Sequence, residues 1–307
     1  MMGKVTVFGS FVVDLMARSP HLPIPGETVK GSMFKMGPGG KGFNQGVAAH
    51  KAGADVLMVT KLGKDSFANV ALETMDRLRM NKDHVFTTER TETGIALILV
   101  DEKSSQNEIL IVPGACATIS KEDIDSLEET IKGSEYVLLQ LEVNQDANER
   151  IADMANRYGC RVIMNSAPYA PMTDEFLSKL YMVTPNEVEA EEITGVPVND
   201  LEGAKRAAAY FRDRGVKKVV ITLGARGVFI SDGETEDIIP AFQVEVVDTT
   251  GAGDAFNGGL LAALSKGQPI PDAVRFGQAV AALSVQRIGT TPAMPTFDEI
   301  EAFLAEH

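Results

Sequence analysis

Hydrophobic and polar positions alternate along the chain with two periods, that of a strand and that of a helix. Short runs rich in β-branched and aromatic residues predict buried strands at residues 4–8, 56–60, 136–141, 161–164, 181–184, 218–222 and 244–247. Amphipathic or small apolar segments predict helices at residues 42–52, 66–78, 123–131, 148–158, 201–214, 255–263, 272–285 and 297–305. This alternation is typical of an α/β fold, with a doubly wound, mostly parallel sheet flanked by helices.

Two segments interrupt the alternation and predict hairpins. Residues 20–36 contain prolines, turn glycines and a short alternating stretch, which favours a hairpin over the crossover helix between parallel strands. The apolar runs 94–100 and 109–112 flank a polar turn and predict a second hairpin, and Gly233 marks a third. The first two hairpins predict a small β-sheet lid at about residues 11–41 and 92–113. Because no repeat or linker divides residues 1–307, we expect a single α/β domain with this lid.

The acidic composition limits the partners that the protein can have. The 307-residue chain has 43 Asp and Glu against 29 Lys and Arg, and its net charge of −14 argues against nucleic acid or an anionic membrane as partner. An anionic substrate would need backbone amides, a metal ion and a few lysines. No apolar run reaches the ~18 residues of a membrane span, and residues 5–13 end at Asp14 without a cleavage pattern. With Cys116 and Cys160 expected as reduced thiols, we expect a cytoplasmic protein.

A glycine-rich segment at residues 248–259 predicts a phosphate site. It follows the predicted strand 244–247 and opens the helix 255–263. The backbone amides of Gly251, Ala252 and Gly253 can approach an anion there, because the first N–H groups of a helix lack intrahelical acceptors and glycine has no Cβ. Asp254 has two interpretations. It compensates the helix dipole, worth ~0.3–1 kcal/mol, or it takes a proton from an attacking hydroxyl.

A second glycine-rich segment, residues 37–42, formally satisfies the Gly-x-Gly-x-x-Gly pattern. A predicted hairpin precedes it, and the next predicted strand runs into Lys61 instead of an acidic residue, so the context of a dinucleotide site is lacking. The Walker pattern also fails, because no Gly-Lys pair is followed by Ser or Thr. Taken alone, the segment predicts a turn that opens the helix 42–52. Asp14 follows the apolar residues 11–13, where we expect a strand of the sheet to end and a ligand to bind.

Residues 39–45 and 248–259 resemble the two signatures of the ribokinase-like (PfkB) carbohydrate kinases, and the motif order is similar from Val5 to about Phe303. The resemblance implies a ribokinase-like fold and transfer of the γ-phosphoryl group of ATP to the 5-hydroxyl of a pentose, D-ribose. It implies that Asp254 is the general base and that residues 251–253 form an anion hole for the transferred group. It also implies a homodimer joined through the lids.

The resemblance also implies binding roles, position by position. Sugar binding is expected of Val12, Asp14, Gly40, Lys41, Asn44, Glu142 and Asp254. Contacts with ATP are expected of Asn186, Thr222, Gly224, Gly227, Gly253 and Gln278. Asn186 and Glu189 would hold Mg²⁺ through water, although their spacing equally predicts a helix capping box. An activating monovalent cation, usually K⁺, would be held by Asp248, Thr250, Ser284, Arg287 and Gly289.

Three positions depart from the pattern of ribokinases. Val12 replaces an Asn, which would leave a buried sugar hydroxyl unpaired at a cost of ~1–3 kcal/mol and so favours a sugar that lacks one hydroxyl. Deoxyribokinases are similar there and at residues 140–143, so 2-deoxy-D-ribose is an alternative substrate. A nucleoside kinase and a non-catalytic sugar sensor are further alternatives. Ala293 replaces a cation-binding Ser, which would weaken K⁺ binding, and Phe43 replaces a small residue, which would narrow the sugar site.

Overall fold

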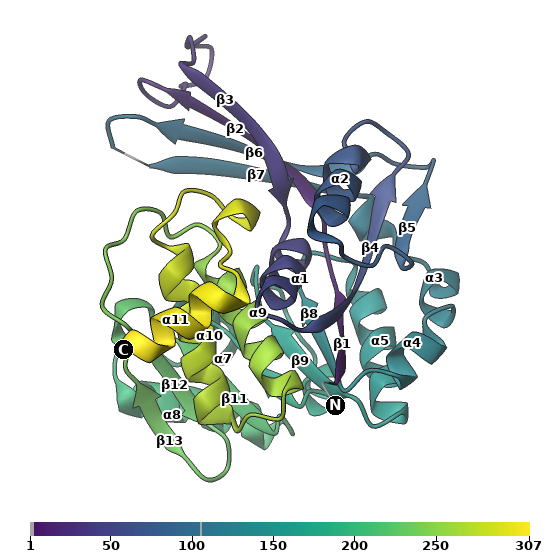
Figure 1. Cartoon of the computed structure of the whole chain (residues 1–307), viewed down its shortest axis with the longest axis vertical. Coiled ribbons are helices and arrows are strands. Elements are labelled where there is room, and N and C mark those ends of the chain that lie inside the picture. The colour runs from purple at the N-terminus through teal and green to yellow at the C-terminus, as the bar shows by residue number, and fades with distance from the viewer. Residues whose placement is uncertain (1–2, 105) are drawn as a thin grey trace.

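A nine-stranded sheet runs through the molecule, and a second sheet of four strands projects from one end (Figure 1). The computed structural model describes residues 3–104 and 106–307. The large sheet has the order β13-β12-β11-β10-β9-β8-β1-β4-β5. Its strands are β1 (Lys4–Phe8), β4 (Asp55–Gly63), β5 (Val85–Thr88), β8 (Tyr136–Gln140), β9 (Arg161–Asn165), β10 (Met182–Val183), β11 (Lys218–Thr222), β12 (Val228–Ser231) and β13 (Glu236–Ile239).

The large sheet is parallel except at one edge, where β12 pairs antiparallel with both β11 and β13. Its central strands are buried on both faces, which explains why they appear in the sequence as continuous apolar runs. The predicted doubly wound α/β fold is confirmed. The prediction of a strand at residues 244–247 is wrong. Val246 and Val247 are more than half exposed, and the Val247 N–H donates to the carbonyl of Val285 in a loop, so the β-branched run has no neighbouring strand to pair with.

Helices connect and flank these strands (Figure 1). They are α1 (Lys41–Lys51), α2 (Ala68–Leu78), α3 (Lys121–Asp125), α4 (Glu128–Lys132), α5 (Gln145–Arg157), α6 (Asp174–Ser178), α7 (Glu187–Thr194), α8 (Leu201–Asp213), α9 (Ala252–Ser265), α10 (Ile270–Ser284) and α11 (Phe297–Glu306). The sequence pattern did not predict α6 or the strand β5.

The predicted helix at residues 123–131 is in fact two short helices. Ser120 caps α3 through a capping box with Asp123, so the first helix begins earlier than predicted. The Ser126 hydroxyl then donates to the Asp123 carbonyl at 2.6 Å. This local hydrogen bond competes with continuation of the helix, and α4 begins only at Glu128.

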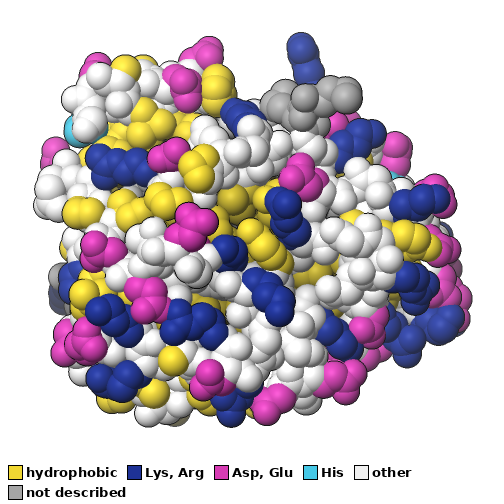
Figure 2. Space-filling view, turned by 90° about the horizontal axis from the view of Figure 1, so that it is seen from below, with side chains coloured by type: hydrophobic (Ala, Val, Ile, Leu, Met, Phe, Trp, Pro, Cys, Tyr) yellow, Lys and Arg dark blue, Asp and Glu magenta, His cyan; other side chains and the backbone are white. Residues whose placement is uncertain are grey.

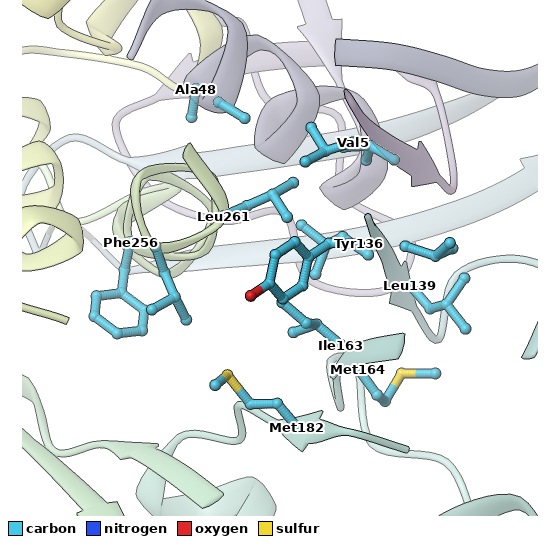
Figure 3. Close-up of a cluster of buried hydrophobic side chains, with 14 of the residues drawn as sticks. Val5, Ala48, Tyr136, Leu139, Ile163, Met164, Met182, Phe256 and Leu261 are labelled. Carbon is cyan, nitrogen blue, oxygen red and sulfur yellow. The ribbon is translucent and has the colours of Figure 1, made fainter. Parts of the chain in front are cut away.

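The hydrophobic core covers both faces of the large sheet, and one part of it lies between the sheet and the helices α1 and α9. Figure 3 shows Leu261 and Phe256 of α9 beside strand residues such as Tyr136 and Ile163, with Ala48 of α1 nearby. Helix α9 packs against both α1 and α10, and both α1 and α9 contact β1 and β8. The core therefore sets how these two helices lie relative to the central strands.

A glycine allows α9 to pack closely against α1. A Cβ added at Gly258 would lie 2.4 Å from the Cβ of Ala48 and 2.7 Å from the backbone nitrogen of Ala49. Any side chain at this position would push the two helices apart. The close approach matters because the first turns of these helices carry Asn44 and Asp254, whose side chains meet.

The small sheet, made of β2 (Val12–Ser19), β3 (Met33–Gly39), β6 (Thr93–Asp101) and β7 (Asn107–Gly114), has the order β3-β2-β6-β7. It confirms the two predicted hairpins, but the first has wider bounds than predicted, because its strands flank residues 20–32. Asp14 lies inside β2 and not at the end of a strand of the large sheet, because the chain leaves that sheet after Phe8. Closure of the small sheet over a bound sugar stays a prediction.

Charged side chains of both signs are distributed over the surface. On the face seen in Figure 2, basic and acidic side chains are interspersed, with hydrophobic ones between them. Within the described parts of the chain, no helix is both long enough and apolar enough to cross a membrane. Cys116 and Cys160 are both free and buried.

Candidate active site

The candidate site lies at the carboxyl edge of the large sheet, beside β1. Chain order reverses there, because β4 is on one side of β1 and β8 is on the other. Ligands of open α/β sheets bind at such a reversal. Polar residues stand where successive strands end, namely Ser10 after β1, Glu142 after β8, Asn165 in β9, Thr184 after β10 and Thr222 in β11.

Asp254 lies in the first turn of α9, as the glycine-rich segment predicts. Gly251 precedes the helix with φ of 76°, a backbone conformation that favours glycine. The Asp254 side chain is only 7% exposed. Its Oδ1 accepts a hydrogen bond from Gln45 Nε2 at 2.9 Å, and its Oδ2 accepts one from Asn44 Nδ2 at 3.2 Å. One donor on each oxygen holds the carboxylate in a single orientation.

The three backbone amides before Asp254 are not equivalent. The Ala252 N–H donates to the Thr249 carbonyl at 3.1 Å, so in this conformation it does not point at a phosphate, contrary to the simple expectation for all three. Gly251 and Gly253 remain the better candidates. A Cβ added at Gly253 would meet nothing within 4 Å, so there is open space beside this residue.

Asp14 reaches the site from the small sheet. A Cβ added at Gly39, its neighbour on β3, would lie 2.1 Å from Asp14 Oδ1, so the missing side chain makes room for the carboxylate. Glu142 follows β8 in the chain, and its side chain reaches the start of α1. Its Oε2 accepts hydrogen bonds from the Lys41 N–H at 2.8 Å and from Ser10 Oγ at 2.5 Å. A carboxylate is favourable at a helix N-terminus because the backbone dipoles carry positive charge there.

The carboxylates of the site raise one another's pKa, and Lys41 opposes this effect at Asp254. Burial raises the pKa of Asp14 to about 7, with further contributions from Glu142 and Asp254. Burial also raises the pKa of Asp254, against the opposing effect of Lys41. Burial alone would lower the pKa of Lys41, but Asp254, Glu142 and Glu189 hold it above its ordinary value. Lys41 therefore lies among carboxylates from both the predicted sugar side and the predicted nucleotide side.

Four of the residues predicted to contact ATP follow β10 or lie at the end of β11 and in the turn after it, whereas Gly253 lies in α9 and Gln278 in α10. The backbones of Asn186 and Thr222 form an isolated parallel β-bridge. The turn that follows Thr222 needs its glycines, because Gly224 and Gly227 have φ of 56° and 107° and a Cβ at Gly227 would lie 2.1 Å from the carbonyl oxygen of Ile239. Gln278 Nε2 donates to that same carbonyl at 2.9 Å, and its Oε1 is buried with no hydrogen-bond partner among the described residues.

Asn186 and Glu189 form a capping box at the start of α7. The Asn186 Oδ1 accepts from the Glu189 N–H at 2.8 Å, and Glu189 Oε2 accepts from the Asn186 N–H at 2.9 Å. The structural interpretation of this motif is thus correct. It leaves the Mg²⁺ interpretation open, because amide and carboxylate oxygens each have further lone pairs.

The five residues predicted to hold a monovalent cation lie on the loop before α9, at the last residue of α10 and on the loop that follows α10. Asp248 Oδ1 accepts from the N–H and the hydroxyl of Thr250, at 2.9 Å and 2.6 Å, and Asp248 Oδ2 accepts from the Gly289 N–H at 2.9 Å. The Arg287 N–H donates to the Ser284 carbonyl at 3.0 Å. Partial burial opposes ionisation of Asp248, but the hydrogen bonds from Thr250 and Gly289 outweigh it and hold its pKa below the ordinary value.

Several residues of the site were not singled out from the sequence. Thr291 Oγ1 donates to Asn44 Oδ1 at 3.0 Å and so fixes the orientation of the Asn44 amide. Ser10 and Gln45 contact the carboxylates of Glu142 and Asp254 directly. Gln45 follows Asn44 in the glycine-rich signature, which was a signal for it. Thr291 carries no such local signal, since it is close to Asn44 only in space.

Two of the three departing positions acquire a structural context. Val12 is 3% exposed and pairs with Gly39 and Gly94 on the neighbouring strands, on the same face of β2 as Asp14. Phe43 is fully buried and packs edge-to-face against Phe11, with ring centroids 5.0 Å apart. Phe43 is therefore part of the hydrophobic core, and any narrowing of the sugar site would act through this packing.

Comparison with known proteins assigns the chain to a family. The model of the "pfkB family carbohydrate kinase" matches residues 2–297. A ribokinase of Haemophilus influenzae is 40% identical over 307 residues, which is 100% of both chains. A deoxyribokinase of Salmonella typhi is 35% identical over 302 residues, or 98% of each chain. The structure of Arabidopsis thaliana ribokinase complexed with ribose and ATP superposes with a TM-score of 0.92 at 30% identity, covering 99% of both chains.

Proposed function

Because the chain belongs to the pfkB family of carbohydrate kinases and is an ATP-dependent sugar phosphotransferase, we propose that it phosphorylates the 5-hydroxyl of D-ribose. The observation that carries the proposal is the contact of Asn44 with Asp254, next to Asp14. The carboxylates of Asp14 and Asp254 supply acceptors for sugar hydroxyls, and the amide of Asn44 supplies a donor. The likeness to a ribokinase complexed with ribose and ATP supports the same choice of substrates.

In this proposal Asp254 is the general base for an in-line transfer. The Asp254 carboxylate takes the proton of the sugar hydroxyl, while the hydroxyl oxygen attacks the γ-phosphorus of ATP. The bond between that phosphorus and the β,γ-bridging oxygen breaks, and ADP leaves. The N–H groups of Gly251 and Gly253 at the start of α9 would stabilise charge on the transferred group. Lys41 lies where it would offset the negative charge of the nearby carboxylates and attract the phosphate chain.

ATP would lie along the edge formed by β10 and β11. Asn186, Thr222, Gly224 and Gly227 meet there, and the buried Oε1 of Gln278 needs a donor that a nucleotide could supply. Asn186 and Glu189 would hold hydrated Mg²⁺, whose chemistry is to neutralise charge on the phosphates. Asp248 and its neighbouring loop would hold K⁺ through oxygen ligands, and the buried Ala293 offers no hydroxyl to it.

The alternative substrate, 2-deoxy-D-ribose, rests on Val12. This apolar side chain stands two residues before Asp14 on the same face of β2, where it offers no hydrogen bond to a hydroxyl. A coupled assay of ADP release with ribose, 2-deoxyribose, fructose, adenosine and adonitol, with and without K⁺, tests the proposal. Ribose or 2-deoxyribose should give the highest kcat/KM. Highest activity with adenosine would identify a nucleoside kinase, and no ADP release with any compound would refute catalysis.

Replacing Val12 with Asn is expected to change the sugar preference. Asn is no larger than Val, so the polar amide fits the space that the buried Val12 side chain fills. A hydrogen bond to the 2-hydroxyl would favour ribose, and the ratio of kcat/KM for ribose to that for 2-deoxyribose should rise about tenfold. Val12→Ala is the control, because it removes volume without adding a donor. An unchanged ratio in Val12→Asn would contradict the specificity role.

We further propose that two copies of the chain pair through their small sheets. Met36, Leu97 and Leu110 lie in one row across the strands, with Leu15 between Met36 and Leu97, and are 49%, 40% and 60% exposed. A contiguous apolar face of this kind usually marks an interface. The variant Leu110→Glu should therefore sediment as a monomer if the wild type sediments as a dimer. The control is Ile24→Glu, since Ile24 is equally apolar and 67% exposed but lies outside the strands.

A further inference from the structure

Behind Asp254 a series of hydrogen bonds runs from Gln45 through Asn165, Thr184 and Asn257 to Gly253. It is here called the amide ring, because the peptide link from Gly253 to Asp254 and the hydrogen bond of Gln45 to Asp254 close it. Gln45 Nε2 donates to Asn165 Oδ1 at 2.9 Å, and Asn165 Nδ2 donates to the Thr184 carbonyl at 2.9 Å. Thr184 Oγ1 donates to Asn257 Oδ1 at 2.6 Å, and Asn257 Nδ2 donates to the Gly253 carbonyl at 2.9 Å. The last of these hydrogen bonds therefore holds Gly253, the residue next to the proposed base.

Two backbone carbonyls fix the direction of every hydrogen bond in the amide ring. The carbonyls of Thr184 and Gly253 can only accept, so Asn165 and Asn257 must each present their NH₂ group to them. Asn165 Oδ1 then faces Gln45, which must donate. Gln45 Oε1 is also occupied, because Gln140 Nε2 donates to it at 2.8 Å. The Gln45 amide therefore cannot flip, and its second N–H is committed to Asp254.

We propose that Gln45 is a positioning residue, which keeps Asp254 ionised and turns its remaining lone pairs toward the acceptor hydroxyl. Gln45 is fully buried, and its Nε2 is 2.9 Å from Asp254 Oδ1. An ionised carboxylate accepts a stronger hydrogen bond from this N–H than a neutral carboxylic acid does, so the hydrogen bond favours the ionised form. The proposal rests on the proposed role of Asp254 as general base.

The charged groups around Asp254 explain why such a donor is needed. Burial and the carboxylate of Glu142 favour the neutral acid, and the charge of Lys41 opposes them, together with the Gln45 and Asn44 amides. Asp14 and Glu189 are two more carboxylates within range of Asp254. Without the Gln45 N–H, the balance shifts toward the protonated form, which cannot accept a proton.

The variant Gln45→Met, of similar volume, tests the proposal through the pH profile. Loss of a hydrogen bond to a charged group should move the acidic limb of kcat to higher pH by about one to two units. kcat is measured at saturating sugar, because Asp14 also titrates near neutrality in the free enzyme. At a pH above the shifted limb, kcat should recover to within about tenfold of the wild-type value. A reduction by the same factor at every pH would overturn the proposal.

A second measurement does not depend on activity. The ¹³C resonance of the Asp254 carboxyl group, identified by its absence in Asp254→Asn, should titrate at higher pH in Gln45→Met than in the wild type. An unchanged titration would refute the effect of Gln45, whatever reaction the protein catalyses. If the titration moves but no sugar is phosphorylated, the proposed function fails while the electrostatic role of Gln45 stands.

Two further variants separate this role from loss of stability. Asn165→Leu removes the acceptor that orients Gln45, so it should shift the Asp254 titration in the same direction by a smaller amount, and it is informative if Gln45→Met does not fold. Thr6→Val breaks a buried hydrogen bond to Ser134 of 2.8 Å, remote from Asp254. It should lower the melting temperature without moving the titration. A shift in Thr6→Val equal to that in Gln45→Met would overturn the proposal.

Discussion

Replacing Asp254 with Asn is expected to lower kcat by about 10²–10⁴-fold, because a positioned general base contributes that much to a proton transfer. The amide has nearly the volume of the carboxylate, so the substitution changes the hydrogen bonds with Asn44 and Gln45 but leaves no cavity. The affinity for ATP should change little. Steady-state ADP release and equilibrium titration with ATP measure the two quantities separately.

Asp272→Asn is a matched control for this prediction. Asp272 occupies the first turn of α10 as Asp254 occupies that of α9, but Asp272 is exposed and remote from the site. If a carboxylate in the first turn only compensates the helix dipole, both variants should lose at most ~1 kcal/mol of stability and keep their activity. Full kcat in Asp254→Asn would therefore show that the dipole interpretation is sufficient and that Asp254 is not the base.

The second large effect is expected for Asp14→Asn, which should raise the KM for the sugar about 10–100-fold and leave the KM for ATP unchanged. A hydrogen bond to a charged acceptor is worth ~1.5–3 kcal/mol, and each 1.4 kcal/mol corresponds to a factor of ten. Gly39→Ala should have the same kind of effect through a different residue, since its Cβ would displace the Asp14 carboxylate. A sugar KM that is unchanged in both variants would remove Asp14 from the sugar site.

The raised pKa of Asp14 adds a pH dependence to this prediction. With a pKa of about 7 in the folded protein, Asp14 is protonated in acid, so the sugar KM of the wild type should rise as the pH falls below about 7. The folded state binds this proton more tightly than the unfolded chain does. Its contribution to stability is therefore present at low pH and lost as the pH rises through about 7. Asp14→Asn should then melt higher than the wild type at about pH 8, with no difference near pH 4.

Asp101→Asn is the control for both measurements. Asp101 ends β6 in the same small sheet, and the N–H groups of Ser104 and Lys103 hold its pKa below the ordinary value. The same substitution there should leave the sugar KM unchanged and should not stabilise the protein at high pH. If it raised the melting temperature as Asp14→Asn does, the gain would come from reduced net charge and not from the burial of Asp14.

The order of strands and helices could be predicted from the sequence because each depends on contacts within a few residues. The capping box of Asn186 and Glu189 joins residues three positions apart. The start of α9 is indicated by the glycines at positions 251 and 253. The chemistry of Asp254 could be suspected on the same grounds. Where the prediction failed, as for the strand at residues 244–247, local preference was present but the neighbouring strand was missing.

The sequence by itself therefore determined the class of fold and the residues that can carry charge at its active edge. Only the tertiary structure decided that Gln45 and Asn44 donate to Asp254 and that Lys41 lies among several carboxylates. The contacts of Asp254 with Gln45 and Asn44 join residues about two hundred positions apart and depend on the close packing of α9 against α1. The pKa of a carboxyl group depends on burial and on charges from other elements, and no pattern within a few residues contains that information.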